Sequence, residues 1–397
     1  MSHLRILSIF NRYLQYGGEE TMVLKMAQTI SKAAIVKEYH YSTAEWLEKG
    51  KLTAPFRGIQ NKEVSLHLRQ LQQKHQFDIW LIHNVFPAMS PAVYREAQRL
   101  KVPVIHILHN YRFGCLNGLL FRNGTECYAC TNGNFLPGIK NKCWKGSFTA
   151  SLFSACFQTI ARKSGILGYT SQFIALSEKQ ARLLKTIGIP ESKTSILPLF
   201  VDTFEQPYIK PPKDGNILFV GRLTPEKGLM HVLQAWAKIS TQRHLVIVGD
   251  GPQKEELQSW VTKHHLSNVL FKGFVPLEEQ ASLWNSASAF IAPSTWHEPG
   301  ATTILEALGR GRPVIAFAKG AAIDHLSNPN YGWLMDPNNP DSIFEKLNIV
   351  LKTSEEKLCE MGTLARYFIQ EQRSPNAWLQ AFMKIANRVT HQNNWPS

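Results

Sequence analysis

Short apolar runs alternate with amphipathic segments along the first half of the chain. Residues 4–10, 78–83 and 103–108 are mostly apolar and have the length of strands that are buried on both faces. Apolar residues recur at helical spacing from Glu19 to Ile30, and the segment from Pro91 to Leu100 also has a helical pattern. Strands that alternate with helices predict a parallel, doubly wound sheet.

The second half of the chain repeats this alternation, so the predicted fold class is α/β with two doubly wound domains. Strand-length apolar runs are again separated by amphipathic segments. The predicted strands are Asn216–Val220, His244–Val248, Ala289–Ala292 and Pro313–Phe317, and the predicted helices include Glu255–His264 and Leu277–Ser286.

A segment rich in proline separates the two halves. Residues 201–215 contain three prolines and end on a glycine, which interrupts regular structure. We therefore expect an N-terminal domain of residues 1–200, a linker of residues 201–215 and a C-terminal domain of residues 216–375. Residues 376–397 follow as a last helix, whose apolar face is expected to pack back onto the body.

The net positive charge of the chain is confined to its first half. The 397 residues carry a formal net charge of +14, while 19% charged and 44% hydrophobic residues exclude a disordered chain. Residues 1–200 hold 25 Lys and Arg against 11 Asp and Glu, whereas residues 201–397 hold 19 of each. This asymmetry indicates that an anionic partner meets the first half.

No part of the sequence resembles a targeting or membrane-spanning segment. The N-terminus lacks a cleavage-site pattern, and the charge-free stretch Gly146–Ala161 is too short and too rich in Ser and Thr to span a bilayer. Six cysteines in a chain of this length are typical of a reduced cytosolic protein. We therefore expect a cytoplasmic protein.

Three loops that follow predicted strands have the composition of phosphate-binding turns. Gly17 and Gly18 precede a helix whose first N–H groups favour an anion, although the G-x-G-x-x-G pattern of dinucleotide sites is missing. Arg222 comes just after a strand and Lys227 at the start of the next helix, an arrangement that suits a diphosphate. Residues 249–252 form the third loop. Tight turns and solvated basic loops share these compositions, so none is specific alone.

Two glutamates separated by seven residues provide the strongest signal. Pro299 and Gly300 break the chain after Glu298, and a helix that starts near Ala301 would put Glu306 about one and a half turns along it. Two carboxylates so placed can contact different parts of one ligand, while the N–H groups of the first helical turn point beyond it. Taken alone, each glutamate also fits a solvated charge or a cap.

The order and spacing of these motifs resemble the donor half of the family 4 retaining glycosyltransferases. The segments that carry the resemblance are Gly221–Gly228, Gly249–Pro252, Glu298–Glu306 and Gly311–Ile315, while Gly17–Glu19 and His109–Arg112 are similar to the N-terminal loops of the family. The resemblance covers essentially the whole chain. It implies the GT-B architecture of two facing Rossmann-like domains, with a nucleotide diphosphate sugar as co-substrate and no cofactor.

The resemblance also implies roles for individual residues. Arg222 and Lys227 would bind the donor diphosphate and stabilise the charge that develops on the leaving group, which is the main electrostatic requirement of sugar transfer. Glu306 would hydrogen-bond the ribose, and Glu298 and His109 would lie beside the transferred sugar. Donor binding is therefore expected at Gly18, Arg222, Lys227, Glu298, Ala301, Thr302, Thr303 and Glu306, and catalysis at His109, Arg222, Lys227 and Glu298. No D-x-D pair occurs in the sequence, so the reaction is expected to be metal-independent, with no metal among the site residues.

Two turns depart from the pattern of the family. The chain has Gly300-Ala301 where an aromatic residue and a glycine are usual, and Gly320-Ala321 where two glycines are usual. We expect these departures to affect the choice of donor more than the presence of activity.

Four of the six cysteines lie in one loop-rich segment. Cys115, Cys127, Cys130 and Cys143 form a C-x11-C-x2-C-x12-C pattern, which could make a structural zinc site. Only one C-x2-C knuckle is present, and reduced thiols in a mobile acceptor loop explain the pattern as well. The sequence leaves both interpretations open.

An apolar stripe with basic flanks follows the cysteine segment. A helix of this kind is more often a core helix with solvated ends than a helix at an anionic membrane interface, and the basic surplus of the first half makes the two interpretations about equal. The stripe consists of Phe148, Leu152, Phe153, Cys156, Phe157 and Ile160, and the flanks of Lys140, Lys142, Lys145, Arg162 and Lys163.

Together these features predict a cytoplasmic glycosyltransferase, peripheral at the inner membrane face. It would move a sugar, with retention, from a nucleotide diphosphate donor to a lipid-linked or glycan acceptor in surface polysaccharide biosynthesis. An anionic membrane surface is a further expected partner, and nucleic acid is not. Two rivals are a nucleotide-sugar epimerase on the same fold, which needs no acceptor, and a basic nucleic-acid-binding protein, for which no recognition-helix or RNA-stacking motif occurs.

Overall fold

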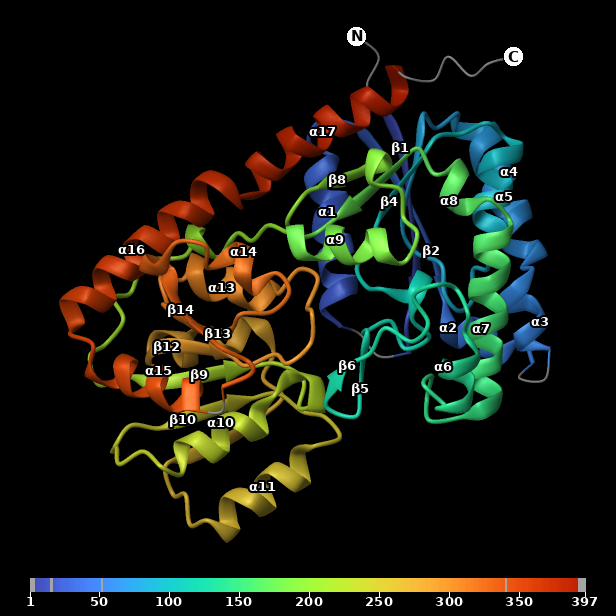
Figure 1. Cartoon of the computed structure of the whole chain (residues 1–397). Coiled ribbons are helices and arrows are strands. Elements are labelled where there is room, and N and C mark those ends of the chain that lie inside the picture. The colour runs from blue at the N-terminus through green and yellow to red at the C-terminus, as the bar shows by residue number, and fades with distance from the viewer. Residues whose placement is uncertain (1–3, 15–16, 51–52, 340, 392–397) are drawn as a thin grey trace. The chain divides into compact units, whose positions relative to one another are not determined.

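The computed structural model describes residues 4–14, 17–50, 53–339 and 341–391. The chain forms two compact units, each built on a six-stranded sheet (Figure 1). Of the described residues, the first unit comprises those up to Arg122, Cys127–Pro198 and those from Trp378 on, and the second comprises Asn123–Glu126 and Leu199–Ala377. The predicted α/β class with two Rossmann-like domains is confirmed.

The sheet of the first unit is parallel throughout, in the order β2-β1-β3-β4-β7-β8. Its inner strands β3 and β4 are buried along their whole length, which explains why they are continuous apolar runs in the sequence. The strands are β1 (Arg5–Arg12), β2 (Ile35–Ser42), β3 (Ile79–Asn84), β4 (Val104–Ile107), β7 (Gln172–Ala175) and β8 (Thr194–Ile196), with a separate pair of short strands β5 (Phe121–Arg122) and β6 (Thr125–Glu126).

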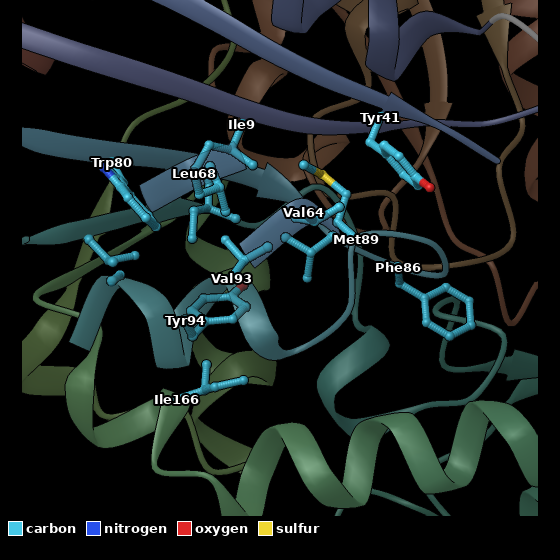
Figure 2. Packing of buried hydrophobic residues seen from close by; sticks show 14 of the residues in the cluster. Ile9, Tyr41, Val64, Leu68, Trp80, Phe86, Met89, Val93, Tyr94 and Ile166 are labelled. Atoms are coloured by element: carbon cyan, nitrogen blue, oxygen red, sulfur yellow. The ribbon is translucent and has the colours of Figure 1, made fainter. Parts of the chain in front are cut away.

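Helices pack on the first sheet through apolar stripes. Val64 and Leu68 of α4 and Val93 of α5 contribute to one buried cluster with Trp80 of β3, as Figure 2 shows. The indole nitrogen of Trp80 donates to Gln72 Oε1 at 2.9 Å, so its polar atom is satisfied. The helices of this unit are α1 (Gly18–Ile30), α2 (Thr43–Glu48), α3 (Ala54–Ile59), α4 (Lys62–His75), α5 (Ala92–Arg99), α6 (Leu136–Lys140), α7 (Phe148–Lys163), α8 (Ile166–Tyr169) and α9 (Glu178–Thr186).

The sheet of the second unit is also parallel throughout, in the order β11-β10-β9-β12-β13-β14. This is the strand order of the dinucleotide-binding Rossmann fold, whose ligands bind where the order reverses, here between β9 and β12. The strands are β9 (Asn216–Val220), β10 (Leu245–Val248), β11 (Val269–Gly273), β12 (Ala287–Ala292), β13 (Val314–Phe317) and β14 (Gly332–Met335). The helices are α10 (Leu229–Trp236), α11 (Lys254–Lys263), α12 (Ala281–Asn285), α13 (Thr302–Gly309), α14 (Ala322–His325), α15 (Asp341–Lys352) and α16 (Glu355–Gln372).

The helix predicted over Leu277–Ser286 is interrupted. A 3-10 turn, Leu277–Glu279, precedes α12, and Gln280 stands between them. The Gln280 side chain donates to the carbonyl of Val275 at 2.8 Å and accepts from Trp284 Nε1 at 3.2 Å. A side chain that bonds back to the preceding loop replaces the continuous helical turn there.

The last helix, α17 (Pro375–His391), belongs to the first unit from Trp378 on. It buries Trp378, Phe382 and Ile385, and the rings of Trp378 and Phe382 stack with centroids 5.2 Å apart. The part of the predicted segment after His391 lies outside the described residues. None of the helices in the described ranges is long and apolar enough to cross a membrane.

Helix α7 buries only part of the stripe that its sequence suggests. Its inward side chains are mostly small, while Phe148 and Leu152 are exposed and Phe153, Cys156 and Ile160 are half-buried. The buried residues of the helix are Ser151, Ser154, Ala155, Phe157, Gln158 and Ala161. At its end, Arg162 points inward and donates to the carbonyls of Phe113 at 3.0 Å and Ile187 at 2.7 Å, so it is not a solvated flanking charge.

Candidate functional site

The loops after β9 and β12 lie at the point where the strand order of the second sheet reverses. Arg222 follows β9 directly, Lys227 ends a 3-10 turn (Pro225–Lys227) before α10, and Glu298 lies in the loop between β12 and α13. Because β9 and β12 are hydrogen-bonded neighbours, their carboxyl ends present these loops side by side. The structure therefore brings together two of the predicted cations and one of the predicted carboxylates.

Lys227 and Glu298 form an ion pair in a largely buried position. Lys227 Nζ contacts Glu298 Oε1, and Ser294 Oγ donates to Glu298 Oε2 at 2.8 Å. Burial alone would raise the pKa of Glu298, but Lys227, Ser294 and Arg222 together hold it below its ordinary value. Glu298 is therefore an ionised carboxylate that a neighbouring lysine neutralises.

Arg222 is a more accessible cation at the same edge. Its side chain is mostly exposed, with Nη2 3.5 Å from Glu226 Oε1. Glu226 is buried and its carbonyl accepts from the N–H of Thr295 at 2.9 Å, which ties the loop after β9 to the loop after β12. A guanidinium held in this way can form bidentate hydrogen bonds with a phosphate.

Gly249 explains the third loop of the sequence. It has a φ of +137°, and a Cβ there would lie 1.9 Å from the carbonyl oxygen of Gly221. Only glycine permits the loop after β10 to lie so close to the residue before Arg222. The loop thus supports the backbone that carries the cation.

The helix α13 starts from a residue in a left-handed conformation. Ala301 has a φ of 41° and ψ of 52°, which alanine adopts only with strain. Because Ala301 has no polar side chain, it leaves the first N–H groups of α13, at Thr302 and Thr303, without a side-chain cap. Glu306 lies further along the helix and is half-buried. The departure at Ala301 therefore keeps the turn but strains it.

Polar contacts from other segments support the Gly300-Ala301 turn and the helix that follows it. His325 Nε2 lies 3.0 Å from the carbonyl oxygen of Gly300, and burial lowers the pKa of His325 to about 4. A neutral His325 can donate to that carbonyl through Nε2–H. The hydroxyl of Thr203 donates to the carbonyl of Glu306 at 3.3 Å.

The second departure, Gly320-Ala321, is explained by backbone geometry. Gly320 has a φ of +54°, and a Cβ there would lie 2.5 Å from the backbone nitrogen and oxygen of Glu298. Ala321 has a φ of −67°, which alanine adopts without strain, and its N–H donates to the Glu298 carbonyl at 2.9 Å. Glycine is needed at the first position and not at the second.

Gly18 and His109 belong to the first unit, and the structure places them relative to that unit alone. Gly18 begins α1, is exposed, and has no neighbour within 4 Å of where a Cβ would lie. His109 follows β4, and its Nε2 lies 3.2 Å from Nδ1 of His83, which is on β3. Burial lowers the pKa of His109 to about 4 and that of His83 well below its ordinary range, so both rings are neutral near pH 7.

A pocket of about 400 Å³ opens beside these histidines in the first unit. His83, His106 and His109 line it together with the aromatic rings of Phe86 and Phe113. Tyr94 OH lies 2.9 Å from His106 Nδ1, and burial, with the charge of His109 as a lesser cause, lowers the pKa of His106 to about 3. The pocket thus combines an apolar wall with neutral hydrogen-bonding rings.

The sequence did not single out three residues that the fold places at these sites. Ser294 contacts Glu298 and His83 contacts His109, and no local motif indicates either residue. Glu19 follows Gly18, and burial raises its pKa to about 7 although the charge of Arg112 opposes the rise. Its position after the glycine pair was the one available signal.

The four cysteines Cys115, Cys127, Cys130 and Cys143 line one cavity of about 330 Å³. Burial raises the pKa of Cys130 to about 11, so its thiol is protonated near pH 7. In the part of the chain that the structure describes, no group of three or more His, Cys, Asp or Glu side chains is arranged to hold a metal ion. Zinc binding accordingly stays a hypothesis from the sequence, which mass spectrometry of the purified protein would test.

Two family descriptions match the chain in succession. "Glycosyltransferase Family 4" matches residues 48–204 and "Glycosyl transferases group 1" matches residues 201–366. An uncharacterized glycosyltransferase of Methanocaldococcus jannaschii is 36% identical over 131 residues, which cover 32% of this chain and 33% of that protein. The putative colanic acid biosynthesis glycosyltransferase WcaL of Escherichia coli is 24% identical over 205 residues, covering 49% of this chain and 50% of that protein.

The fold also matches a solved structure over nearly its whole length. The crystal structure of Anabaena HepE in complex with UDP and glucose has a TM-score of 0.69 and 17% identity, covering 97% of this chain and 100% of that chain. The strand order of the second unit, the loops at its switch point and these matches agree. The chain belongs to the family 4, group 1 glycosyltransferases and has their GT-B fold.

Proposed function

We propose that this protein is a retaining glycosyltransferase that takes a sugar from a nucleotide diphosphate donor bound at the second unit. The observation that carries the proposal is the ion pair of Lys227 and Glu298 beside Arg222, at the switch point of a Rossmann sheet. Anabaena HepE binds UDP and glucose, which supports a nucleotide sugar as the donor.

In the proposed reaction, the bond between the anomeric carbon and the diphosphate breaks and a bond from the same carbon to an acceptor hydroxyl forms. The acceptor proton leaves with the diphosphate, and the configuration at the anomeric carbon is retained. Arg222 and Lys227 stabilise the negative charge that the diphosphate gains, which is the largest electrostatic demand of the step. These cations supply the charge that a metal ion would otherwise provide, so the proposed reaction is metal-independent.

The remaining residues of the second unit position the donor. The N–H groups of Ala301, Thr302 and Thr303 and the carboxylate of Glu298 contact the sugar, and Glu306 accepts hydrogen bonds from the ribose hydroxyls. Glu298 is suited to this part because Lys227 keeps it ionised, and an ionised carboxylate accepts hydrogen bonds from sugar hydroxyls.

Gly18 and the neutral ring of His109 are the contribution that we propose for the first unit. A neutral imidazole next to the sugar can accept or donate one hydrogen bond without adding charge. The proposed acceptor is lipid-linked or a glycan, used in surface polysaccharide biosynthesis at the cytoplasmic face of the inner membrane. The name of WcaL, a colanic acid biosynthesis protein, supports this assignment.

A thermal-shift screen of UDP, GDP, ADP and their sugars tests the proposal. A donor at 100 times its Kd stabilises the folded state by about 2.7 kcal/mol, so one nucleotide family should raise Tm and the others should not. If none of these compounds changed Tm, the proposed donor site would be contradicted. Incubation of the protein with the selected donor alone distinguishes transfer from epimerisation, because an epimerase would convert the donor without an acceptor.

A further inference from the structure

The first unit exposes several large apolar side chains on three helices that pack together. Phe56 of α3 is 77% exposed, Leu136 of α6 is 51% exposed, and Phe148 and Leu152 of α7 are 52% and 43% exposed. Helix α7 packs against both α3 and α6 (Figure 1). These four residues form what we call the apolar patch.

Helix α7 exposes two of its large apolar residues, while Phe157 is buried and Phe153 packs against the core. Its buried residues are mostly small, such as Ser151, Ser154 and Ala155, whereas Phe148 and Leu152, one turn apart, are exposed. A core helix would bury the larger residues, since these gain most from leaving water. The orientation therefore fits an apolar partner outside the unit.

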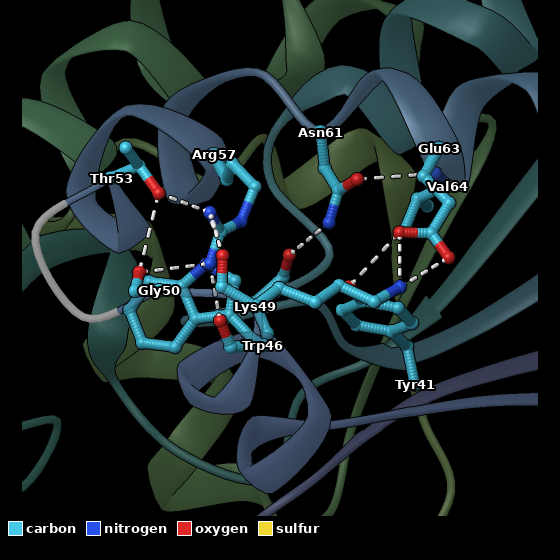
Figure 3. A network of polar contacts seen from close by, with 10 residues as sticks. Tyr41, Trp46, Lys49, Gly50, Thr53, Arg57, Asn61, Glu63 and Val64 are labelled. Carbon is cyan, nitrogen blue, oxygen red and sulfur yellow. Dashed lines mark hydrogen bonds and ion pairs between the residues drawn. The ribbon is translucent and has the colours of Figure 1, made fainter.

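Helix α3 is held firmly although it is short. Arg57 donates to the carbonyl oxygens of Trp46 at 2.5 Å, Lys49 at 3.0 Å and Gly50 at 3.1 Å, as Figure 3 shows. Gly58 lies against the ring of Phe153, so close that a Cβ would come within 2.5 Å of the ring. Phe56 is thus presented from a fixed element of the fold.

The segment that carries α6 and α7 is basic. The segment from Cys127 to Ser177 contains no Asp or Glu, although it includes all of α6 and α7. Lys140, Lys142 and Lys145 lie between Leu136 and Phe148 in the sequence and are exposed. Exposed apolar side chains with exposed lysines between them in the sequence match an anionic bilayer, which offers acyl chains below a layer of negative headgroups.

We propose that the apolar patch and Lys140, Lys142 and Lys145 dock the first unit on an anionic phospholipid membrane. A second copy of the chain is a poorer occupant, because it would bring the same positive charge against these lysines. The inference rests on the membrane location in the proposed function, but not on sugar transfer. It names the surface that meets the lipid.

Vesicle flotation of the full chain tests this docking, without donor or acceptor present. The protein should float with vesicles of phosphatidylcholine and phosphatidylglycerol and not with phosphatidylcholine alone. The triple variant Phe56→Ser, Phe148→Ser, Leu152→Ser should lower partitioning roughly tenfold or more, since it removes the side chains that enter the bilayer. Replacing Lys140, Lys142 and Lys145 by Gln should lower it about fivefold per lysine at low salt.

Phe274→Ser is the matched control, because Phe274 is 76% exposed and lies in the second unit. It should bind vesicles as the unchanged protein does. All variants should keep their Tm and the Tm shift that the donor causes, so a loss of vesicle binding alone supports the docking surface and leaves the proposed function untouched. Equal binding by the triple variant, equal binding to neutral vesicles, or a dimer that the triple variant abolishes would each overturn the proposal.

Discussion

The ionisable groups at the carboxyl ends of the two sheets are in opposite states. In the second unit, Glu298 is buried yet ionised, because Lys227 lies against it. In the first unit, buried His83 and half-buried His109 lie against each other rather than against an acidic group of the described residues, and both are neutral. Burial favours the neutral form of both a carboxylate and an imidazole, so the difference lies in whether the fold supplies a partner of opposite charge.

The net charge of the two halves shows the reverse distribution. The half with the neutral histidines carries the whole surplus of +14, while the half with the charged pair is balanced. The net charge of a unit is therefore separate from its placed charge, by which we mean the cations Arg222 and Lys227 that the fold positions at the donor site. We propose that the placed charge binds the diphosphate and that the basic surplus of the first half meets a membrane surface.

Removal of the placed cations should have the largest effect. Arg222→Ala and Lys227→Ala should each lower sugar transfer by about 10²–10³-fold, as loss of one transition-state donor does in other enzymes. Glu306→Ala should weaken donor use by a similar order. Initial rates with the selected donor measure this, with Lys272→Ala, an exposed lysine of β11, as the control. Unchanged rates in all three site variants would refute the site assignment.

Lys227→Met should make Glu298 resemble the uncompensated groups of the first unit. A largely buried carboxylate without its partner should lower the free energy of unfolding by somewhat less than the ~3–5 kcal/mol typical of fully buried pairs. The double variant Lys227→Met, Glu298→Gln should recover most of the loss. Urea unfolding measures both. Lys254→Met, which breaks the solvent-accessible pair with Asp250, should leave stability nearly unchanged.

The neutral histidines predict a loss of stability in acid. The pKa of His109 is about 4 in the folded state, below the unfolded value near 6.5, so the unfolded chain binds the proton first as the pH falls. Between pH 7 and pH 5, His109 should therefore cost roughly 1–2 kcal/mol of stability, and His109→Gln should reduce the fall in the free energy of unfolding, measured with urea, by that amount. His244→Gln, at an exposed histidine, is the control.

Glu19 should act in the opposite direction over the same range. Its pKa is about 7 in the folded state and near 4.5 when exposed, so the folded chain binds that proton first. Glu19→Gln should therefore steepen the loss of stability between pH 7 and pH 5. If neither His109→Gln nor Glu19→Gln changed the pH dependence, the contrast between the two units would fail.

Ala301→Gly should have the smallest effect. Relief of the left-handed conformation should raise the free energy of unfolding by about 0.5–1 kcal/mol, which a small rise in Tm would report. The same exchange at Ala321, with a φ of −67°, should lower stability instead. A lower Tm for Ala301→Gly would show that the turn is not strained.

The sequence predicts the central strands well and the edges poorly. β3, β4, β9 and β10 are continuous apolar runs because both of their faces are covered. The edge strand β2 is fully buried at one position only and mixed in composition, and it was not predicted. An edge strand takes its conformation from its neighbour, which a local pattern does not record.

The spacing of apolar residues predicted where these helices lie in the sequence, but not always which side of a helix is buried. α17 buries its large apolar face, as expected, whereas α7 shows an equally clear stripe and buries mostly the small residues instead. At the site, local motifs predicted Arg222 and Lys227 in the loop after β9 and Glu298 in the loop after β12. Ser294 and His83 were not marked, because their roles arise from contacts across separate segments.

Binding calorimetry of the nucleoside diphosphate selected by the thermal screen tests the central claim most directly. The unchanged protein and the Lys140→Gln, Lys142→Gln, Lys145→Gln variant should bind it with the same Kd, while the Arg222→Ala, Lys227→Ala variant should bind at least about tenfold more weakly. Equal affinity in all three proteins, or a loss confined to the Lys140, Lys142 and Lys145 variant, would contradict the separation of placed charge from net charge.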